Sequence, residues 1–161
     1  MDHVYLKGTT KYTVSLCTIE DIEPIYAIVA SLVTDVSKEE YVKKMHKSVT
    51  VDMAYKVTCN NKIVSVFFTD KVINTWLGYV IWSQNIVPLI LVLKTFVEDF
   101  GDRRIKFYPH VGMLQSIKSI VTRKSIRLIH NGNPYLIVNT KEVGIKMEKL
   151  YYKLGISKCQ L

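Results

Sequence analysis

The longest uninterrupted apolar stretch of the chain covers residues 86–93. Its eight residues are far fewer than the roughly 20 that a membrane-spanning helix needs, so we expect this stretch in a protein core. Pro88 fits the first turn of a helix, where a missing N–H is no loss, and Gly101 after Phe100 is a typical helix stop. The stretch therefore predicts a buried helix that begins near Pro88 and ends at Phe100.

Strand patterns dominate the sequence before this helix. Alternation of polar and apolar residues predicts strands over 11–17, 52–59, 62–69 and 76–83. Asn60 and Asn61 form a turn signal between the second and third of these strands, which predicts a hairpin.

Two helices are expected between the first and second strands. Thr18 is followed by an acid at the third position after it, Asp21, which is typical of a helix start. The first helix then carries Pro24 in its first turn and an apolar stripe formed by Ile25, Ile28, Val29, Leu32 and Val33. Ser37 and Glu40 repeat the start signal and predict a shorter, lysine-rich and mostly exposed helix to about residue 47.

The segment after Gly101 returns to short alternating elements. We expect a strand over 103–108, a helix over 113–122, and a hairpin of strands 126–130 and 135–138 around Asn131-Gly132. A last helix over 141–154 ends at Gly155. The order predicts an α/β (α+β) fold in one domain over 1–161, with a mixed, mostly antiparallel sheet of about six to seven strands flanked by helices.

The net charge of +8 is unevenly distributed. Residues 1–80 carry nine basic and nine acidic side chains, whereas residues 81–161 carry thirteen basic and five acidic ones. This asymmetry suits an anionic partner such as nucleic acid, an acidic protein or a phosphorylated cofactor. A solvated basic face without a dedicated partner remains the alternative. The candidate anion or nucleic-acid patch consists of Arg103, Arg104, Arg123, Lys124 and Arg127.

Cysteines and histidines give no metal-binding pattern. The three cysteines (Cys17, Cys59, Cys159) and the four histidines (His3, His46, His110, His130) are scattered and lack the spacing of known zinc or redox motifs. We expect no metal site and reduced thiols. The N-terminal residues lack the basic and apolar regions of a secretory leader, so we expect a protein that is not secreted and has no membrane contact.

Three segments make the chain similar to the GNAT superfamily of N-acetyltransferases. Residues 18–25 resemble the opening of that family's first helix, and residues 60–65 resemble its hairpin into the second strand of the meander. Residues 149–155 resemble the end of a late helix of the family, although here they follow an additional hairpin. The resemblance implies a GNAT-like fold over most of the chain.

The resemblance also points to a cofactor loop at residues 84–89. In the family, a Gln/Arg-x-x-Gly-x-Gly/Ala loop after the fourth strand holds the pyrophosphate of acetyl-CoA on backbone N–H groups. Gln84 matches this pattern, but Val87 and Leu89 stand at the glycine positions, and Pro88 removes an N–H. The corresponding cofactor-binding candidates are Gln84, Asn85, Ile86 and Val87. We expect no cofactor, with acetyl-CoA as the alternative.

The family commonly uses a Glu base near its central strands and a Tyr acid after the fifth strand. No Glu lies in 76–83, and Asp70 at the end of the preceding strand is the nearest carboxylate. Tyr108 is the candidate acid, and Tyr152 is a second one if residues 149–155 give the true register. Asp70 and Tyr108 also have purely structural interpretations: Asp70 as a turn residue and Tyr108 as the last residue of a strand.

A degenerate GNAT-like domain of this order also resembles small internal or accessory proteins of short-tailed bacteriophages. A composition rich in Lys, Ile, Tyr and Asn suits an AT-rich viral genome. This resemblance implies a viral accessory or virion-associated protein, located in the host cytoplasm or the virion, that binds an acidic virion protein or DNA. A working acetyl-CoA-dependent N-acetyltransferase with an altered loop and a small basic nucleic-acid-binding protein are the alternatives.

Overall fold

The computed structural model describes residues 2–32, 36–72, 75–107, 121–130 and 132–160. Within these residues nine strands form one sheet in the order β7-β8-β6-β5-β4-β3-β2-β1-β9, in which every pair is antiparallel except β5 with β6. The strands are β1 (His3–Lys7), β2 (Thr10–Leu16), β3 (Ala54–Cys59), β4 (Lys62–Val72), β5 (Thr75–Ser83), β6 (Arg104–Phe107), β7 (Ile126–His130), β8 (Asn133–Asn139) and β9 (Ile156–Lys158).

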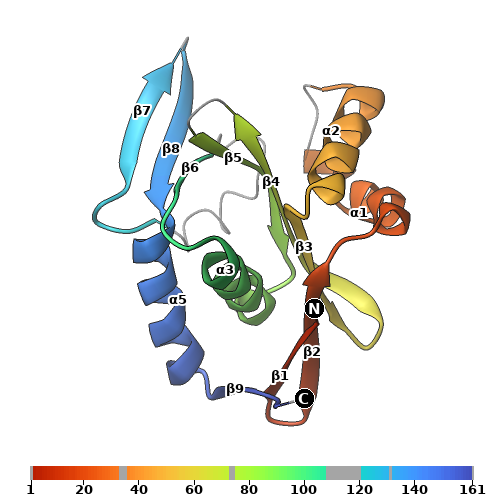
Figure 1. Ribbon diagram of the computed structural model, residues 1–161, viewed down its shortest axis with the longest axis vertical. Coiled ribbons are helices and arrows are strands. Elements are labelled where there is room, and N and C mark those ends of the chain that lie inside the picture. The colour runs from red at the N-terminus through yellow and green to blue at the C-terminus, as the bar shows by residue number, and fades with distance from the viewer. Residues whose placement is uncertain (1, 33–35, 73–74, 108–120, 131, 161) are drawn as a thin grey trace.

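Helices cover both faces of this sheet. They are α1 (Ile22–Val29), α2 (Lys38–Thr50), α3 (Ile86–Phe100) and α5 (Thr140–Lys153), with short 3-10 turns η1 (Ile19–Asp21) and η2 (Ala30–Leu32) on either side of α1. Figure 1 shows α3 and α5 on one side of the curved sheet and α1 and α2 on the other. Two separate apolar cores result, one around α3 and one beneath α1 and α2.

Helix α3 is the buried helix that the apolar stretch predicts. It begins at Ile86, has Pro88 as its third residue and ends before Gly101, whose φ is 65°. The helix is apolar on nearly all sides because the sheet covers one side and α5 lies along another. Gly144 of α5 permits this approach, since a Cβ there would lie 2.8 Å from Val97 Cγ1.

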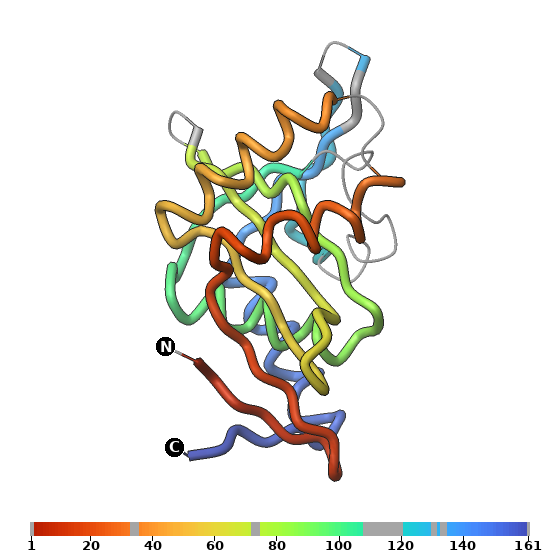
Figure 2. The backbone as a smooth tube through the Cα atoms, turned by 90° about the vertical axis from the view of Figure 1, so that its right-hand side faces the viewer, coloured from red at the N-terminus to blue at the C-terminus, as the bar shows by residue number. Residues whose placement is uncertain are grey.

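The predicted mixed, mostly antiparallel α/β fold is confirmed, but the predicted number of strands is too low. The sheet of the described residues has nine strands rather than six or seven, because β1 and β9 were not expected. Both are short, and β9 gains its hydrogen bonds by pairing with β1 rather than with a neighbour in sequence. A tertiary pairing of this kind leaves little local pattern. Figure 2 shows these first and last strands side by side.

The helix-start signals are confirmed. The Thr18 N–H donates to Asp21 Oδ2 at 2.7 Å, and Ser37 Oγ accepts from the Glu40 N–H at 3.3 Å. Helix α2 continues to Thr50, three residues beyond the expected end, and it is less exposed than expected. One of its faces is buried against the sheet because its apolar and small residues recur at helical spacing: Tyr41, Met45, Ser48 and Val49.

The hairpin predictions are also confirmed. Asn60 and Asn61 join β3 to β4 with φ values of 50° and 61°, as a tight turn requires. Strands β7 and β8 pair around residues 131–132, and Gly132 has a φ of 78°. The helix expected over 113–122 falls mainly on residues outside the described ranges, and Val121 and Thr122 are not helical.

Candidate functional site

The junction between β5 and α3 contains the residues that match the cofactor loop. The Gln84 N–H donates to Val64 O at 2.8 Å, so Gln84 still extends the pairing of β5 with β4. Asn85 is extended, and its Oδ1 accepts the Val87 N–H at 3.1 Å as the N-cap of α3. Ser83 Oγ donates to Asn85 O at 2.7 Å and fixes this cap. The side chains of Ser83 and Asn85 therefore hydrogen-bond to backbone groups of the junction itself.

Val87 and Leu89 are core residues. Val87 is 5% exposed and Leu89 2% exposed, and both belong to the apolar core around α3. Pro88 between them has no N–H to donate. Among the first three residues of α3, Ile86 alone offers a backbone N–H that no described residue accepts. The positions at which the family has glycine thus serve packing here.

A shallow cavity of about 550 Å³ lies against this end of α3. One wall comes from the hairpin of β1 and β2 and the other from the start of the helix; the lining residues are Lys7, Gly8, Thr10, Tyr12, Asn85, Ile86 and Val87. Lys7 is the one formally charged residue among these described residues. The positive end of the helix and Lys7 favour an anion, but the N–H donors are few.

Strands β5 and β6 run parallel over only three residue pairs of the described chain, which end at Gly78 with Phe107. A Cβ at Gly78 would lie 2.1 Å from Phe107 Cε1, so only glycine allows the phenyl ring to lie over β5. The pairing of β4 with β5 shifts at the same level: Phe68 pairs with Val80 and Thr69 with Gly78, which leaves Tyr79 as an extra residue.

The shifted residue Tyr79 belongs to a polar cluster beneath α2. Its hydroxyl hydrogen-bonds to Ser48 Oγ and donates to the Lys44 carbonyl at 3.1 Å, while Lys44 Nζ lies 4.4 Å from the ring centroid. Burial raises the pKa of the Tyr79 hydroxyl and lowers the pKa of the Lys44 ammonium. The tyrosine therefore stays protonated and acts as a hydrogen-bonding group.

Asp70 belongs to the same cluster. It lies within β4 opposite Leu77, not at the end of the strand as expected, because β4 continues to Val72. Its carboxylate is nearly buried and forms an ion pair with Lys47 of α2, with 3.1 Å between Nζ and Oδ1. This ion pair connects α2 to β4.

Comparison with known proteins identifies the fold. The structure matches an acetyltransferase of the GNAT family from Bacillus cereus ATCC 10987 with a TM-score of 0.57 and 13% identity, over 80% of this chain and 95% of that chain. It matches Ard1 from Thermoplasma volcanium with a TM-score of 0.50 and 12% identity, over 78% of this chain and 95% of that one. The chain has a GNAT-like fold.

No family model matches the sequence, and no curated protein matches it either. At 13% identity or less, the structural likeness shows the fold alone. The comparison thus confirms the GNAT-like fold predicted from three short segments. It does not extend the activity of the neighbours to this chain.

Of the two candidate tyrosines, the structure describes only Tyr152. Tyr108 lies outside the described residues. Tyr152 lies in the last turn of α5, is 69% exposed, and packs its ring edge-to-face on Tyr151 with 5.4 Å between centroids. Helix α5 follows the β7–β8 hairpin and leads into β9, which agrees with the additional hairpin expected before residues 149–155.

The five candidate basic residues are all exposed, and most lie around the start of α5. Arg104 pairs with Asn139 at the end of β8, and the Arg103 N–H donates to Thr140 Oγ1 at 2.7 Å. Lys124, next to Arg123, forms an ion pair with Glu142 at 3.1 Å. Arg127 lies farther along β7, opposite Leu136. Their role in binding stays a prediction.

Within the described ranges, no group of three or more His, Cys, Asp or Glu side chains could hold a metal ion, and no helix is long and apolar enough to cross a membrane. Sequence reasoning missed the hairpin side of the cavity at α3, because β1 was not expected. It also missed the Tyr79–Ser48 contact, which depends on the shift between β4 and β5.

Proposed function

We propose that this chain is a GNAT-like protein that does not transfer acetyl groups and acts by binding an acidic protein partner, as a viral accessory or virion-associated protein. The observation that supports the loss of acetyl transfer is the start of α3, where Val87 and Leu89 are buried and Asn85 accepts the Val87 N–H. A pyrophosphate needs several free N–H groups at such a helix end. The residues present do not fit that cofactor.

The far end of the sheet supports a binding role. On the face of β6–β8 that points away from α3, Arg104 and Lys106 share the surface with Ile126 and Leu128, which are 46% and 42% exposed. Ile129 on the edge strand β7 is 76% exposed. Figure 1 shows β7 at the outer edge of the sheet. Exposed apolar side chains bordered by polar ones are typical of a protein interface, and arginine is enriched there.

Nucleic acid fits this surface less well. Protein–DNA interfaces are strongly positive and polar, whereas here large apolar side chains separate the basic ones. Arg127 also faces the opposite side of the sheet from Arg104, because it pairs in register with Leu136 and Phe107. The arrangement therefore favours an acidic protein over DNA.

Fluorescence anisotropy tests the proposal with three labelled probes: polyglutamate, a peptide of equal charge with interspersed leucines, and short duplex DNA. We expect the leucine-containing acidic peptide to bind most tightly. Neutralising Arg104 and Lys106, the two basic residues of that face of β6–β8, to Gln should weaken its binding by at least about tenfold, and salt should weaken it as well.

A matched control neutralises two exposed lysines of the other half, Lys11 and Lys62. This variant should retain binding. An equal loss of peptide binding in both variants would refute a localised surface. If duplex DNA bound more tightly than the acidic peptide and with a steep salt dependence, the partner would be nucleic acid and not an acidic protein.

The cavity at the start of α3 favours one second candidate, an acetyltransferase with an altered loop. Lys7 and the positive helix end could contact a phosphate there. Direct measurement of acetyl-CoA binding separates the two functions.

A further inference from the structure

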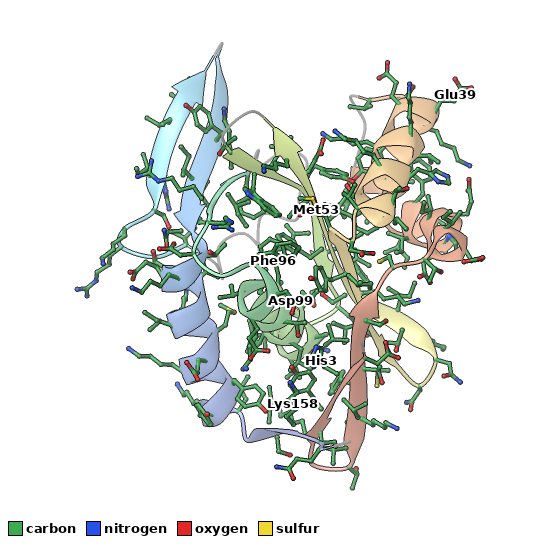
Figure 3. The ribbon with its side chains drawn as sticks, viewed as in Figure 1. His3, Glu39, Met53, Phe96, Asp99 and Lys158 are labelled. Carbon is green, nitrogen blue, oxygen red and sulfur yellow. The ribbon has the colours of Figure 1, made fainter. Side chains whose placement is uncertain are left out.

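A second cavity lies at the opposite end of α3. It has a volume of about 240 Å³ and opens between the last turns of α3 and the strands β1, β2 and β3; its lining residues are His3, Val14, Ser15, Leu16, Tyr55, Thr95 and Asp99. Figure 3 shows His3 and Asp99 in this region, between α3 and β1. None of the GNAT-like loop residues 84–89 lines it.

Asp99 is the one acidic residue among the described lining residues of this cavity, and it is exposed at the cavity rim. Oδ2 accepts a hydrogen bond from the Tyr55 hydroxyl at 2.6 Å. No ion pair joins Asp99 to a cation of the described residues, and the neighbouring Glu98 pairs instead with Lys94. On a chain with a net charge of +8, an unpaired carboxylate at the rim of a cavity is a distinct negative spot.

The end of α3 makes this spot more negative. Glu98 and Asp99 lie in the last turn, which carries no basic residue. The C-terminal end of a helix has a partial negative charge, so acids there are unfavourable and a cation is favourable. A positively charged ligand beside Asp99 would offset the charge of this carboxylate and the partial negative charge of the helix end.

The inner walls define the rest of the ligand. Tyr55 is 3% exposed and Thr95 1% exposed, and the partly buried Leu16 gives most of the accessible apolar surface of the wall. Burial, with the hydrogen bond to Asp99, raises the pKa of the Tyr55 hydroxyl, so Tyr55 remains a donor that fixes the carboxylate. Such a cavity combines one anionic acceptor with a short apolar recess.

We propose that this cavity binds a small primary ammonium compound, with the ammonium group donating to Asp99 and a short apolar chain lying against Leu16 and Tyr55. The ligand class follows from the unpaired carboxylate, the helix end and the apolar walls. The site is separate from the start of α3, so it does not depend on the proposed function.

Nuclear magnetic resonance titration tests this site with n-butylammonium chloride as the probe and n-butanol as its neutral analogue. We expect n-butylammonium to shift the resonances of His3, Tyr55 and Thr95, and n-butanol to shift them far less. Asp99→Asn removes the charge but keeps an acceptor for Tyr55. It should weaken n-butylammonium binding by about tenfold or more.

Glu98→Gln is the matched control, because it removes the same charge one residue away, outside the cavity. Its binding should stay within about twofold of the parent protein. Asp99→Asn should fold, since the change relieves an unfavourable charge at a helix end. Equal binding by Asp99→Asn and the parent, equal binding of n-butanol, or resonance shifts confined to other regions would each overturn the proposal.

Discussion

The two ends of α3 differ in which polar groups remain for a ligand. At the start, Asn85 occupies the Val87 N–H and Pro88 has none, so the positive end of the helix offers few donors. At the end, Asp99 keeps a carboxylate that no described cation pairs with. The end that resembles a family motif therefore has one backbone N–H, that of Ile86, left among the first three residues of the helix.

The hairpin of β1 and β2 explains why both ends carry a cavity. Helix α3 is buried from Val87 to Leu93, and its exposed residues lie at its two ends, Ile86 at the start and Glu98 and Asp99 in the last turn. The hairpin follows the helix and contributes Lys7, Thr10 and Tyr12 at the start and His3, Val14 and Leu16 at the end. One unpredicted strand, β1, thus contributes to both cavities.

The largest effect is expected from Leu89→Ala at the start of α3. Because Leu89 is 2% exposed, we expect a loss of about 3 kcal/mol in the free energy of unfolding, measured by urea denaturation. Ile86→Ala, at a position 39% exposed, should cost much less. Similar small losses in both variants would mean that position 89 is not a packing position, and the comparison of the two ends would fail.

At the other end, Gly101→Ala should cost about 2 kcal/mol. The reason is conformational, since Gly101 has a φ of 65° and a ψ of −144°, and an added Cβ would meet nothing within 4 Å. Urea denaturation measures the loss. A cost near zero would contradict a helix end held by the glycine conformation.

Asn85→Ala removes the cap of α3 and should cost about 1 kcal/mol. Ser37→Ala removes the comparable cap of α2, and its loss of unfolding free energy is the reference for the Asn85 variant. If the Asn85 variant lost nothing while Ser37→Ala did, the Val87 N–H would not depend on Asn85, and the start of α3 would keep a donor for anions.

The smallest effect concerns the pH dependence of stability at the end of α3. Burial and Asp99 raise the pKa of Tyr55 in the folded state above the unfolded value of about 10. Its contribution is fully present below about pH 10 and is lost as the pH rises further. Tyr55→Phe should therefore flatten the alkaline loss of stability in urea titrations, whereas Tyr152→Phe, at an exposed position, should not. If the free energy of unfolding fell equally with rising pH in the parent protein, Tyr55→Phe and Tyr152→Phe, this prediction would be contradicted.

Most of the fold could be predicted from the sequence because its signals are local. Asn60-Asn61, Pro88, Gly101 and the Thr18 start signal each specify a backbone conformation within a few residues, and the structure has each of them. Strand β9 could not be predicted, since three residues pair with β1 across the whole length of the chain.

The candidate site was predicted less well, for a different reason. The loss of glycine at Val87 and Leu89 is visible in the sequence, but the cap by Asn85 and the burial of both side chains are tertiary facts. The sequence does not indicate a role for Asp99, because nothing near it in sequence points to Tyr55, its hydrogen-bond partner 44 residues away.

The most direct test of the central claim is the thermal and chemical stability of the protein with acetyl-CoA. A ligand present at about 100 times its dissociation constant stabilises a folded protein by about 2.7 kcal/mol. We predict no change in the free energy of unfolding at millimolar acetyl-CoA, because the start of α3 offers too few donors for the pyrophosphate. A stabilisation of that size, lost in a Lys7→Gln variant, would show that the start of α3 binds the cofactor and would contradict the account.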